Sequence, residues 1–65
     1  MLTSWRLQRI IEGLTQAEVA RAARITVGRL SLIERGLLRP TREESDRLTD
    51  VLAYRAARAA HEVRA

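Results

Sequence analysis

The chain has 65 residues, 46% of them hydrophobic, and a formal net charge of +4 at pH 7. It contains no cysteine, one histidine and no apolar run approaching the roughly 20 residues of a membrane helix, so it offers no disulfide, metal cluster, cofactor site or catalytic triad. We therefore expect one small cytoplasmic domain that is not an enzyme, needs no cofactor and does not bind membranes.

The first two helices are predicted from capping signals. A helix is expected to begin at Thr3 or Ser4 and to stop at Gly13, because glycine commonly follows the last residue of a helix. Its apolar residues are Leu7, Ile10, Ile11 and Leu14. Thr15 and Glu18 form a capping box that begins the second helix, with Glu18 reaching back to the amide of Thr15. The inner face of this second helix consists of Val19, Ala20 and Ala23.

A third helix is expected over about residues 26–34, opened by Thr26 and stopped by Gly36. Residues placed at 100° intervals give it an inner side of Leu30, Ile33 and Glu34. The opposite side consists of Gly28, Leu32 and Arg35, flanked by Arg29 and Ser31. Pro40 keeps the residue before it extended, and the capping box of Thr41 and Glu44 begins a fourth helix. The inward residues of the fourth helix are Leu48, Val51 and Leu52.

Residues 54–65 contain no glycine, proline or new cap and consist almost wholly of good helix formers. We expect the fourth helix to continue through them, with or without a bend near Tyr54, and to fray near Val63. The chain then divides into a domain of residues 1–53 and a helical extension of residues 54–65. A stripe of Tyr54, Ala57 and His61 either pairs with its copy in a homodimer or stays solvated. The fold class is all-α, a bundle of four to five helices.

The second and third helices together fit a helix-turn-helix, since three or four residues join them and small residues stand where they would cross. Ala20 and Ala23 allow a close approach of the two helices. The angle between the helices is filled by Ile25, Leu30 and Ile33. Short capped helices also occur in small bundles with other functions, so this geometry alone does not establish DNA binding.

The positive charge lies in one part of the chain. Residues 1–39 hold seven arginines against Glu12, Glu18 and Glu34, whereas residues 40–65 balance five arginines with five acidic residues. All basic residues are arginine, which suits the recognition of phosphates and base edges, although a GC-rich coding sequence explains the same choice. The uneven distribution is what a phosphate-facing surface needs.

The segments GLTQAEVARAARIT, LSLIERG and the later RP resemble the phage-repressor (Cro/CI or Xre) family of helix-turn-helix domains. The resemblance covers about residues 6–53 and implies a lambda-repressor-like fold and a regulator, often a repressor, that binds DNA. Members commonly dimerise through elements after the fourth helix. Arg9 and Glu34 match a pair that forms a structural salt bridge between the first and third helices of the family.

The resemblance also implies contacts with the DNA backbone. Gln16 matches a position at the start of the second helix that contacts a phosphate, where the helix dipole helps. Arg35 and Arg39 match backbone-contacting positions after the third helix. The alternatives are that Gln16 only fills the first turn and that the two arginines are merely solvated. Contacts of this kind would set affinity and docking register without reading sequence.

The surface that matches the recognition helix consists of Val27, Gly28, Arg29, Ser31 and Leu32. In one interpretation, Val27 and Leu32 contact thymine methyl groups and Gly28 lets the backbone approach closely. Arg29 or Ser31 then makes the polar contact with a base edge. In a second interpretation the helix docks in the groove and sequence preference comes from DNA shape. In a third, the apolar residues belong to a protein interface.

Arg24 lies in the turn where the family usually has glycine in a left-handed conformation. A side chain there costs on the order of 1–2 kcal/mol, which favours another geometry for the turn. The alternative is that Arg24 points towards DNA or a partner.

We therefore expect a small transcription regulator that docks its third helix in the major groove of an operator or promoter. Its expected partners are double-stranded DNA, a second copy of the chain and a protein of the transcription machinery. The candidate DNA-binding residues are Gln16, Thr26, Val27, Gly28, Arg29, Ser31, Leu32, Arg35 and Arg39. The rival is a protein-interaction module on the same scaffold, an accessory or inhibitor that binds a polymerase, toxin or regulator. Its surface would consist of Val27, Leu32, Leu37 and Leu38.

Overall fold

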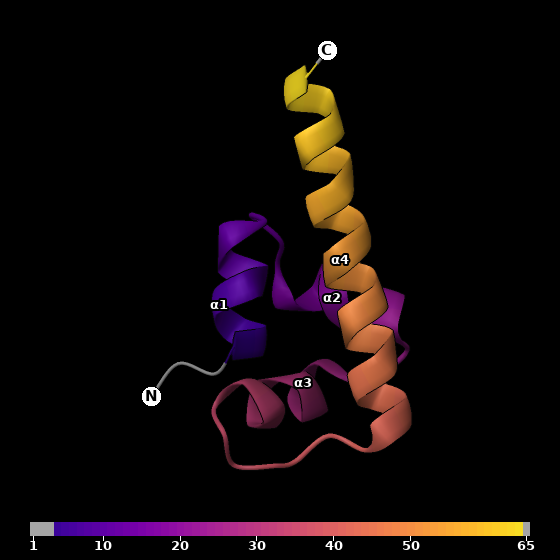
Figure 1. Ribbon diagram of the computed structural model, residues 1–65. Helices are drawn as coiled ribbons and strands as arrows, with labels where there is room; N and C mark the ends of the chain where they lie inside the picture. The colour runs from indigo at the N-terminus through magenta and orange to yellow at the C-terminus, as the bar shows by residue number, and fades with distance from the viewer. Residues whose placement is uncertain (1–3, 65) are drawn as a thin grey trace.

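The computed structural model describes the backbone of residues 4–64 and the side chains of residues 4–53. The helices are α1 (Ser4–Ile11), α2 (Gln16–Ala23), α3 (Val27–Glu34) and α4 (Arg42–Arg64), and these described residues form no strand. The all-α fold predicted from the sequence is confirmed, with four helices between residues 4 and 64, arranged as in Figure 1. The proposed stripe of Tyr54, Ala57 and His61 lies outside the described side chains.

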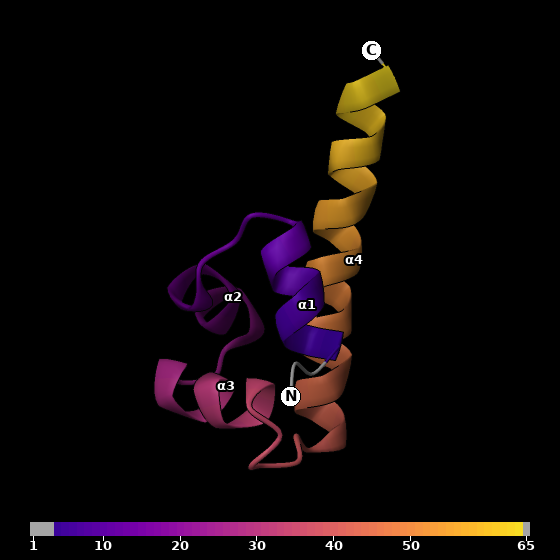
Figure 2. The ribbon, with the colours of Figure 1, turned by 90° about the vertical axis from the view of Figure 1, so that its left-hand side faces the viewer.

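The long helix α4 organises the arrangement. It packs against α1 and α2, and α3 packs against the same two helices. The N-terminal end of α4 and helix α3 lie at one end of the molecule, while the C-terminal half of α4 extends beyond the other three helices in both views (Figures 1 and 2). Its 23 residues span ~35 Å at about 1.5 Å per residue. The domain that can bury a core is therefore confined to the first half of α4 and the three short helices.

The core is formed by α2, α3 and α4, from residues that were predicted to face inward. The buried apolar residues are Val19, Ala20 and Ala23 of α2, Leu30 and Ile33 of α3, and Leu48 and Leu52 of α4. The predicted inner faces of α2 and α3 are confirmed, and in α4 Val51 packs at the edge of this cluster. Small side chains at Ala20 and Ala23 let α2 approach its neighbours closely, which sets the position of α3.

Helix α1 turns a different side inward from the one that its apolar residues suggested. Leu7, Ile10 and Ile11 are 47%, 49% and 65% exposed, and Trp5 packs against the core instead. Trp5 and Arg9 stand one turn apart, and at 100° per residue the three aliphatic residues fall on the opposite side of the helix. Because Arg9 must reach a buried carboxylate of α3, its side of α1 faces inward and the aliphatic side faces out.

Helices α1, α2 and α3 all end in a Schellman motif. Gly13, Arg24 and Gly36 adopt φ values of 70°, 60° and 75°. In each case the N–H of the following residue donates to a carbonyl five residues earlier; these bonds join Leu14 to Arg9, Ile25 to Ala20 and Leu37 to Leu32. This pattern satisfies backbone carbonyls that a helix end leaves unpaired. The predicted stops at Gly13 and Gly36 are confirmed.

The turn between α2 and α3 keeps the left-handed geometry despite its arginine. Arg24 has φ 60° and ψ 44°, so the expectation of another turn geometry is wrong. Its N–H donates to the carbonyl of Arg21, and the N–H of Ile25 donates to that of Ala20, at 3.2 and 3.0 Å. Ile25 also packs against the core. These contacts hold the turn in a conformation that costs a non-glycine residue about 1–2 kcal/mol.

Threonine hydroxyls cap α2 and α3. The N–H of Glu18 donates to Oγ1 of Thr15, and the N–H of Arg29 donates to Oγ1 of Thr26, at 3.1 and 3.0 Å. The carboxylate of Glu18 accepts a hydrogen bond from the Thr15 hydroxyl at 3.1 Å, where the sequence had predicted a bond from the Thr15 amide. Both helices therefore begin where the sequence placed them.

Candidate nucleic-acid interface

The outward side of α3 is here named the α3 face and consists of Val27, Gly28, Leu32 and Arg35. Val27 and Leu32 are 45% and 39% exposed. A Cβ atom added at Gly28 would meet nothing within 4 Å, so no internal packing requires a glycine there. The α3 face therefore presents two apolar side chains beside a stretch of accessible helix backbone.

The loop after α3 adds arginines and one exposed leucine to this side. Arg35 and Arg39 are both exposed, as the sequence required for phosphate contacts. Leu37 is 64% exposed, whereas Leu38 packs against the core. Of the residues predicted for a protein interface, Val27, Leu32 and Leu37 are therefore exposed, whereas Leu38 is not available to a partner.

Two further candidate DNA-binding residues, Ser31 and Thr26, differ in their exposure. Ser31 is half-buried on the flank of α3. Thr26 is exposed, but its hydroxyl accepts the N–H of Arg29 as the N-cap of α3. A hydroxyl that accepts one hydrogen bond still has a proton to donate, so the cap and a DNA contact are compatible at Thr26.

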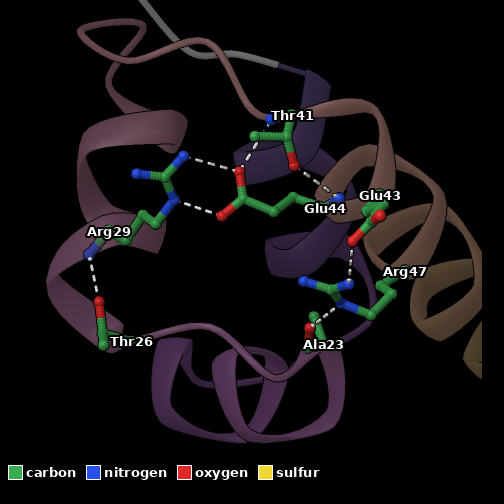
Figure 3. A network of polar contacts seen from close by, with 7 residues as sticks. All are labelled: Ala23, Thr26, Arg29, Thr41, Glu43, Glu44 and Arg47. Atoms are coloured by element: carbon green, nitrogen blue, oxygen red, sulfur yellow. Dashed lines mark hydrogen bonds and ion pairs between the residues drawn. The ribbon is translucent and has the colours of Figure 1, made fainter.

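Arg29, the charged residue that the sequence proposed as a base reader, is paired with Glu44 of α4 (Figure 3). Its Nε donates to Oε2 of Glu44, and its Nη2 donates to Oε1 at 2.9 Å. The Arg29 side chain is 37% exposed and the Glu44 side chain 8% exposed. The pair thus joins the first turn of α3 to the first turn of α4, with the acid inside and the base reaching the surface.

Glu44 is also part of the cap of α4. The N–H of Thr41 donates to Oε1 of Glu44 at 2.8 Å, and the N–H of Glu44 donates to the Thr41 hydroxyl at 3.2 Å, which completes the predicted capping box. The hydrogen bond from Arg29 and then the one from the Thr41 amide lower the pKa of the Glu44 carboxyl to about 2. Glu44 raises the pKa of Arg29 through the same hydrogen bond. Both groups are therefore charged at neutral pH.

A second pair joins α1 to the other end of α3. Arg9 donates from Nε to Oε2 of Glu34 at 2.8 Å and from Nη2 to Oε1 at 3.1 Å, and its Nη1 donates to the carbonyl of Leu14 at 2.7 Å. Glu34 is 1% exposed. Gln16 donates from Nε2 to Oε1 of Glu34 at 3.1 Å. The residue proposed for a phosphate contact is thus anchored to the salt bridge that orients α3.

Sequence reasoning missed two contacts that position this surface. Glu44 was predicted as a cap but not as the partner of Arg29, because fifteen residues separate the two and no local pattern links them. Arg47 donates from Nε to the carbonyl of Ala23 at 2.6 Å and thereby caps the C-terminal end of α2. A basic residue one turn after a capping box gives no signal of this role, since the sequence does not show which helix end lies beside it.

The part of the chain that the structure describes holds neither a metal-binding cluster nor a membrane-spanning helix. No group of three or more His, Cys, Asp or Glu side chains there could hold a metal ion. No helix among these residues is both long and apolar enough to cross a membrane.

Two helices joined by a tight left-handed turn, with the second helix exposing one side, define a helix-turn-helix domain. A family model described as a helix-turn-helix domain matches residues 2–62. The chain therefore belongs to the helix-turn-helix domain family. No curated protein and no solved structure matches the chain.

Proposed function

We propose that the protein is a small DNA-binding transcription regulator that docks α3 in the major groove of an operator or promoter. The observation that carries this proposal is the α3 face, which is exposed, apolar and basic. Glu34 lies on α3, and Glu44 contacts Arg29 of α3. Both carboxylates are buried and paired with an arginine. The α3 face therefore carries no exposed carboxylate of its own that would repel phosphates.

Backbone contacts are assigned to Gln16, Arg35 and Arg39. Gln16 uses one amide proton for Glu34, which leaves its second proton for a phosphate at the start of α2. The partial positive charge of the α2 N-terminus favours the same contact. Arg35 and Arg39 are exposed in the segment that follows α3. Contacts at both places would fix the register of α3 in the groove.

Base reading is assigned to the α3 face and its flanks. The exposed methyl groups of Val27 and Leu32 suit thymine methyls, and Gly28 permits close approach of the backbone. The polar contact comes from Arg29, Ser31 or Thr26. An apolar face of this kind also suits a preference set partly by DNA shape.

The finer identity that we propose is a phage-repressor (Cro/CI or Xre) type of regulator, acting as a repressor in the cytoplasm. It is supported by the spacing of the motifs that resemble that family and by the ion pair between Arg9 and Glu34, which matches the family's bridge. We also propose a homodimer formed through the extension of residues 54–65. Such a dimer would contact two half-sites about one DNA turn, ~34 Å, apart.

The rival function is a protein-interaction module, and Val27, Leu32 and Leu37 favour it as exposed apolar residues on one side. Salt distinguishes the two functions. Binding through several phosphates weakens steeply with added salt, whereas an apolar interface changes little.

Selection from a pool of randomised duplexes, followed by sequencing of the bound fraction, tests the proposal. We expect an enriched motif, and a palindrome in it would give the half-site spacing of a dimer. Replacement of Arg39 by alanine should weaken binding to every duplex alike and reduce the salt slope by about 1. Absence of any enriched motif, or binding that is insensitive to salt, would overturn the proposal in favour of the protein-interaction module.

A further inference from the structure

In the ion pair of Arg29 and Glu44, one edge of the guanidinium donates hydrogen bonds to the carboxylate, and a second edge makes no contact with it. Glu44 accepts from Nε and Nη2 of Arg29, and no described residue accepts a hydrogen bond from Nη1. In Figure 3 this third nitrogen lies on the side of the guanidinium away from Glu44. Because all three nitrogens of arginine carry protons, Nη1 and the second proton of Nη2 still present two parallel donors.

This remaining edge has the geometry that a guanine needs. Guanine presents O6 and N7 as neighbouring acceptors in the major groove, and a bidentate arginine is the commonest specific contact to it. Arg29 stands on the flank of the α3 face, and its side chain is 37% exposed, against 8% for Glu44. The part of the pair that reaches solvent is therefore the arginine, with the acid behind it.

Glu44 also favours such a contact in two ways. It is fixed by the Thr41 amide at 2.8 Å as well as by Arg29, so the arginine is held by an anchored partner. The rotamer freedom of Arg29 is then lost on folding and not on binding, which favours affinity. In addition, the opposite charges of Arg29 and Glu44 cancel at a distance, so the pair attracts phosphates only weakly. Arg29 is then suited to an acceptor that makes direct hydrogen bonds with its guanidinium.

We propose that Glu44 is a positioning residue for sequence reading: it holds Arg29 so that the Nη edge of the guanidinium meets O6 and N7 of a guanine in the major groove. The proposal rests on the proposed DNA-binding function. It adds a residue outside the helix-turn-helix that sets base preference without touching DNA, and it chooses Arg29 over Ser31 as the polar reader.

The test compares variants on the duplex selected by the wild-type protein and on single-base variants of that duplex. Glu44→Gln is the central variant, because glutamine can keep the capping box with Thr41 but cannot pair with arginine as a carboxylate does. Glu43→Gln is the matched control, since Glu43 is a neighbouring acid whose side chain is 89% exposed and whose ion pair is with Arg47 at 3.8 Å. Circular dichroism verifies that each variant is folded.

We expect Arg29→Ala to abolish a preference for guanine of about 5- to 150-fold at one position, and Arg29→Lys to abolish most of it. Glu44→Gln should reduce the preference at that same position while strengthening binding to unrelated duplexes, because the released arginine is drawn to phosphates. Its salt slope should steepen by up to about 1. Glu43→Gln should keep the wild-type preference, and the double variant of Arg29 and Glu44 should lose no more preference than Arg29→Ala.

Three other outcomes would contradict the proposed function, the role of Glu44 or the guanine contact of Arg29. If the wild-type protein selects no motif, the proposed function and this inference both fail. If a motif is selected but Glu44→Gln keeps its full base preference, the inference alone fails, and Glu44 serves only the fold. If Arg29→Ala weakens binding to all duplexes equally, Arg29 contacts a phosphate and the assignment to guanine is wrong.

Discussion

Two arginine–glutamate ion pairs fix the position of α3, and they differ in how many hydrogen-bond donors of the arginine remain available to another molecule. Arg9 uses all three side-chain nitrogens inside the protein, on Glu34 and the carbonyl of Leu14. Arg29 makes the same paired contact with Glu44 but directs its third nitrogen away from that partner (Figure 3). The side chains of Arg9 and Arg29 are 14% and 37% exposed. The ion pair and its neighbouring carbonyl thus occupy every side-chain nitrogen of Arg9, whereas Nη1 of Arg29 has no acceptor among the described residues.

The two pairs lie towards opposite ends of α3. Glu34 joins the last turn of α3 to α1, and Arg29 joins its first turn to α4. A short helix fixed in this way keeps one orientation relative to α2, whose small residues let it pack closely. From this difference we expect the Arg9 pair to serve mainly stability, and we propose that the Arg29 pair serves recognition.

The largest effect is expected from Arg9→Ala. Removing Arg9 takes two charge-assisted hydrogen bonds from the buried Glu34 carboxylate, at a cost of roughly 3–5 kcal/mol. Because a domain of this size is only marginally stable, we expect most of the protein to unfold near room temperature. Urea denaturation followed by circular dichroism measures the change. Arg29→Ala serves as the comparison and should cost clearly less; equal losses would show that the two pairs have the same role.

The Glu44 pair should persist far into the acid range. The pKa of Glu44 is about 2 in the folded protein and near 4.5 as an ordinary glutamate, so the unfolded chain binds its proton first as the pH falls. The contribution of Glu44 to stability is then fully present above about pH 5 and is lost as the pH falls from about 4.5 towards 2. The difference in unfolding free energy between wild type and Glu44→Gln should shrink over that range. Glu43→Gln should show no comparable trend, and a constant difference for Glu44→Gln would contradict the assignment.

Arg24→Gly should stabilise the protein. Glycine adopts the left-handed φ of 60° without the penalty that a Cβ atom brings, so we expect a gain of about 1 kcal/mol, or ~4–8 °C in Tm. Arg24→Ala removes the same guanidinium but keeps a Cβ atom, and it should give no such gain. A gain for both variants would attribute the effect to charge. The glycine variant also provides a background in which Arg9→Ala can be measured.

The smallest effect on stability is expected at Gly28, on the α3 face. Alanine has room there and is the better helix former, so Gly28→Ala should raise stability by less than about 1 kcal/mol. If the backbone at Gly28 lies against DNA, the same variant should weaken binding to the selected duplex. Thermal unfolding and a binding titration measure the two changes. A variant that is more stable and binds DNA as well as the wild type would show that Gly28 makes no close contact.

The parts of the fold that could be predicted from the sequence are those that depend on residues close together in the chain. The caps at Thr15, Thr26 and Thr41 and the inner faces of α2 and α3 depend on residues three or four apart, and they were correctly predicted. The inward side of α1 was not, because its three aliphatic residues are more apolar than the side that holds Arg9. The pairing of Arg9 with the inward Glu34, which the family resemblance implied, is the signal that would have placed the Arg9 side inward.

The candidate site was less predictable for a related reason. The sequence named Arg29 but gave it no partner, since Glu44 meets it only after the loop of residues 35–41 returns the chain to α3. It likewise gave Gln16 a phosphate and not the carboxylate of Glu34. Pairings across helices depend on the packing of the whole domain, so the residues of a site can be named before the geometry that determines their roles.

The most direct test of the central claim is a map of backbone amide shifts in isotope-labelled protein titrated with the selected duplex. We expect the largest changes at residues 26–32 and at the start of α2, with α1 nearly unaffected. Changes centred instead on Leu7, Ile10 and Ile11, the exposed side of α1, would rule out docking through α3 and identify a different binding surface.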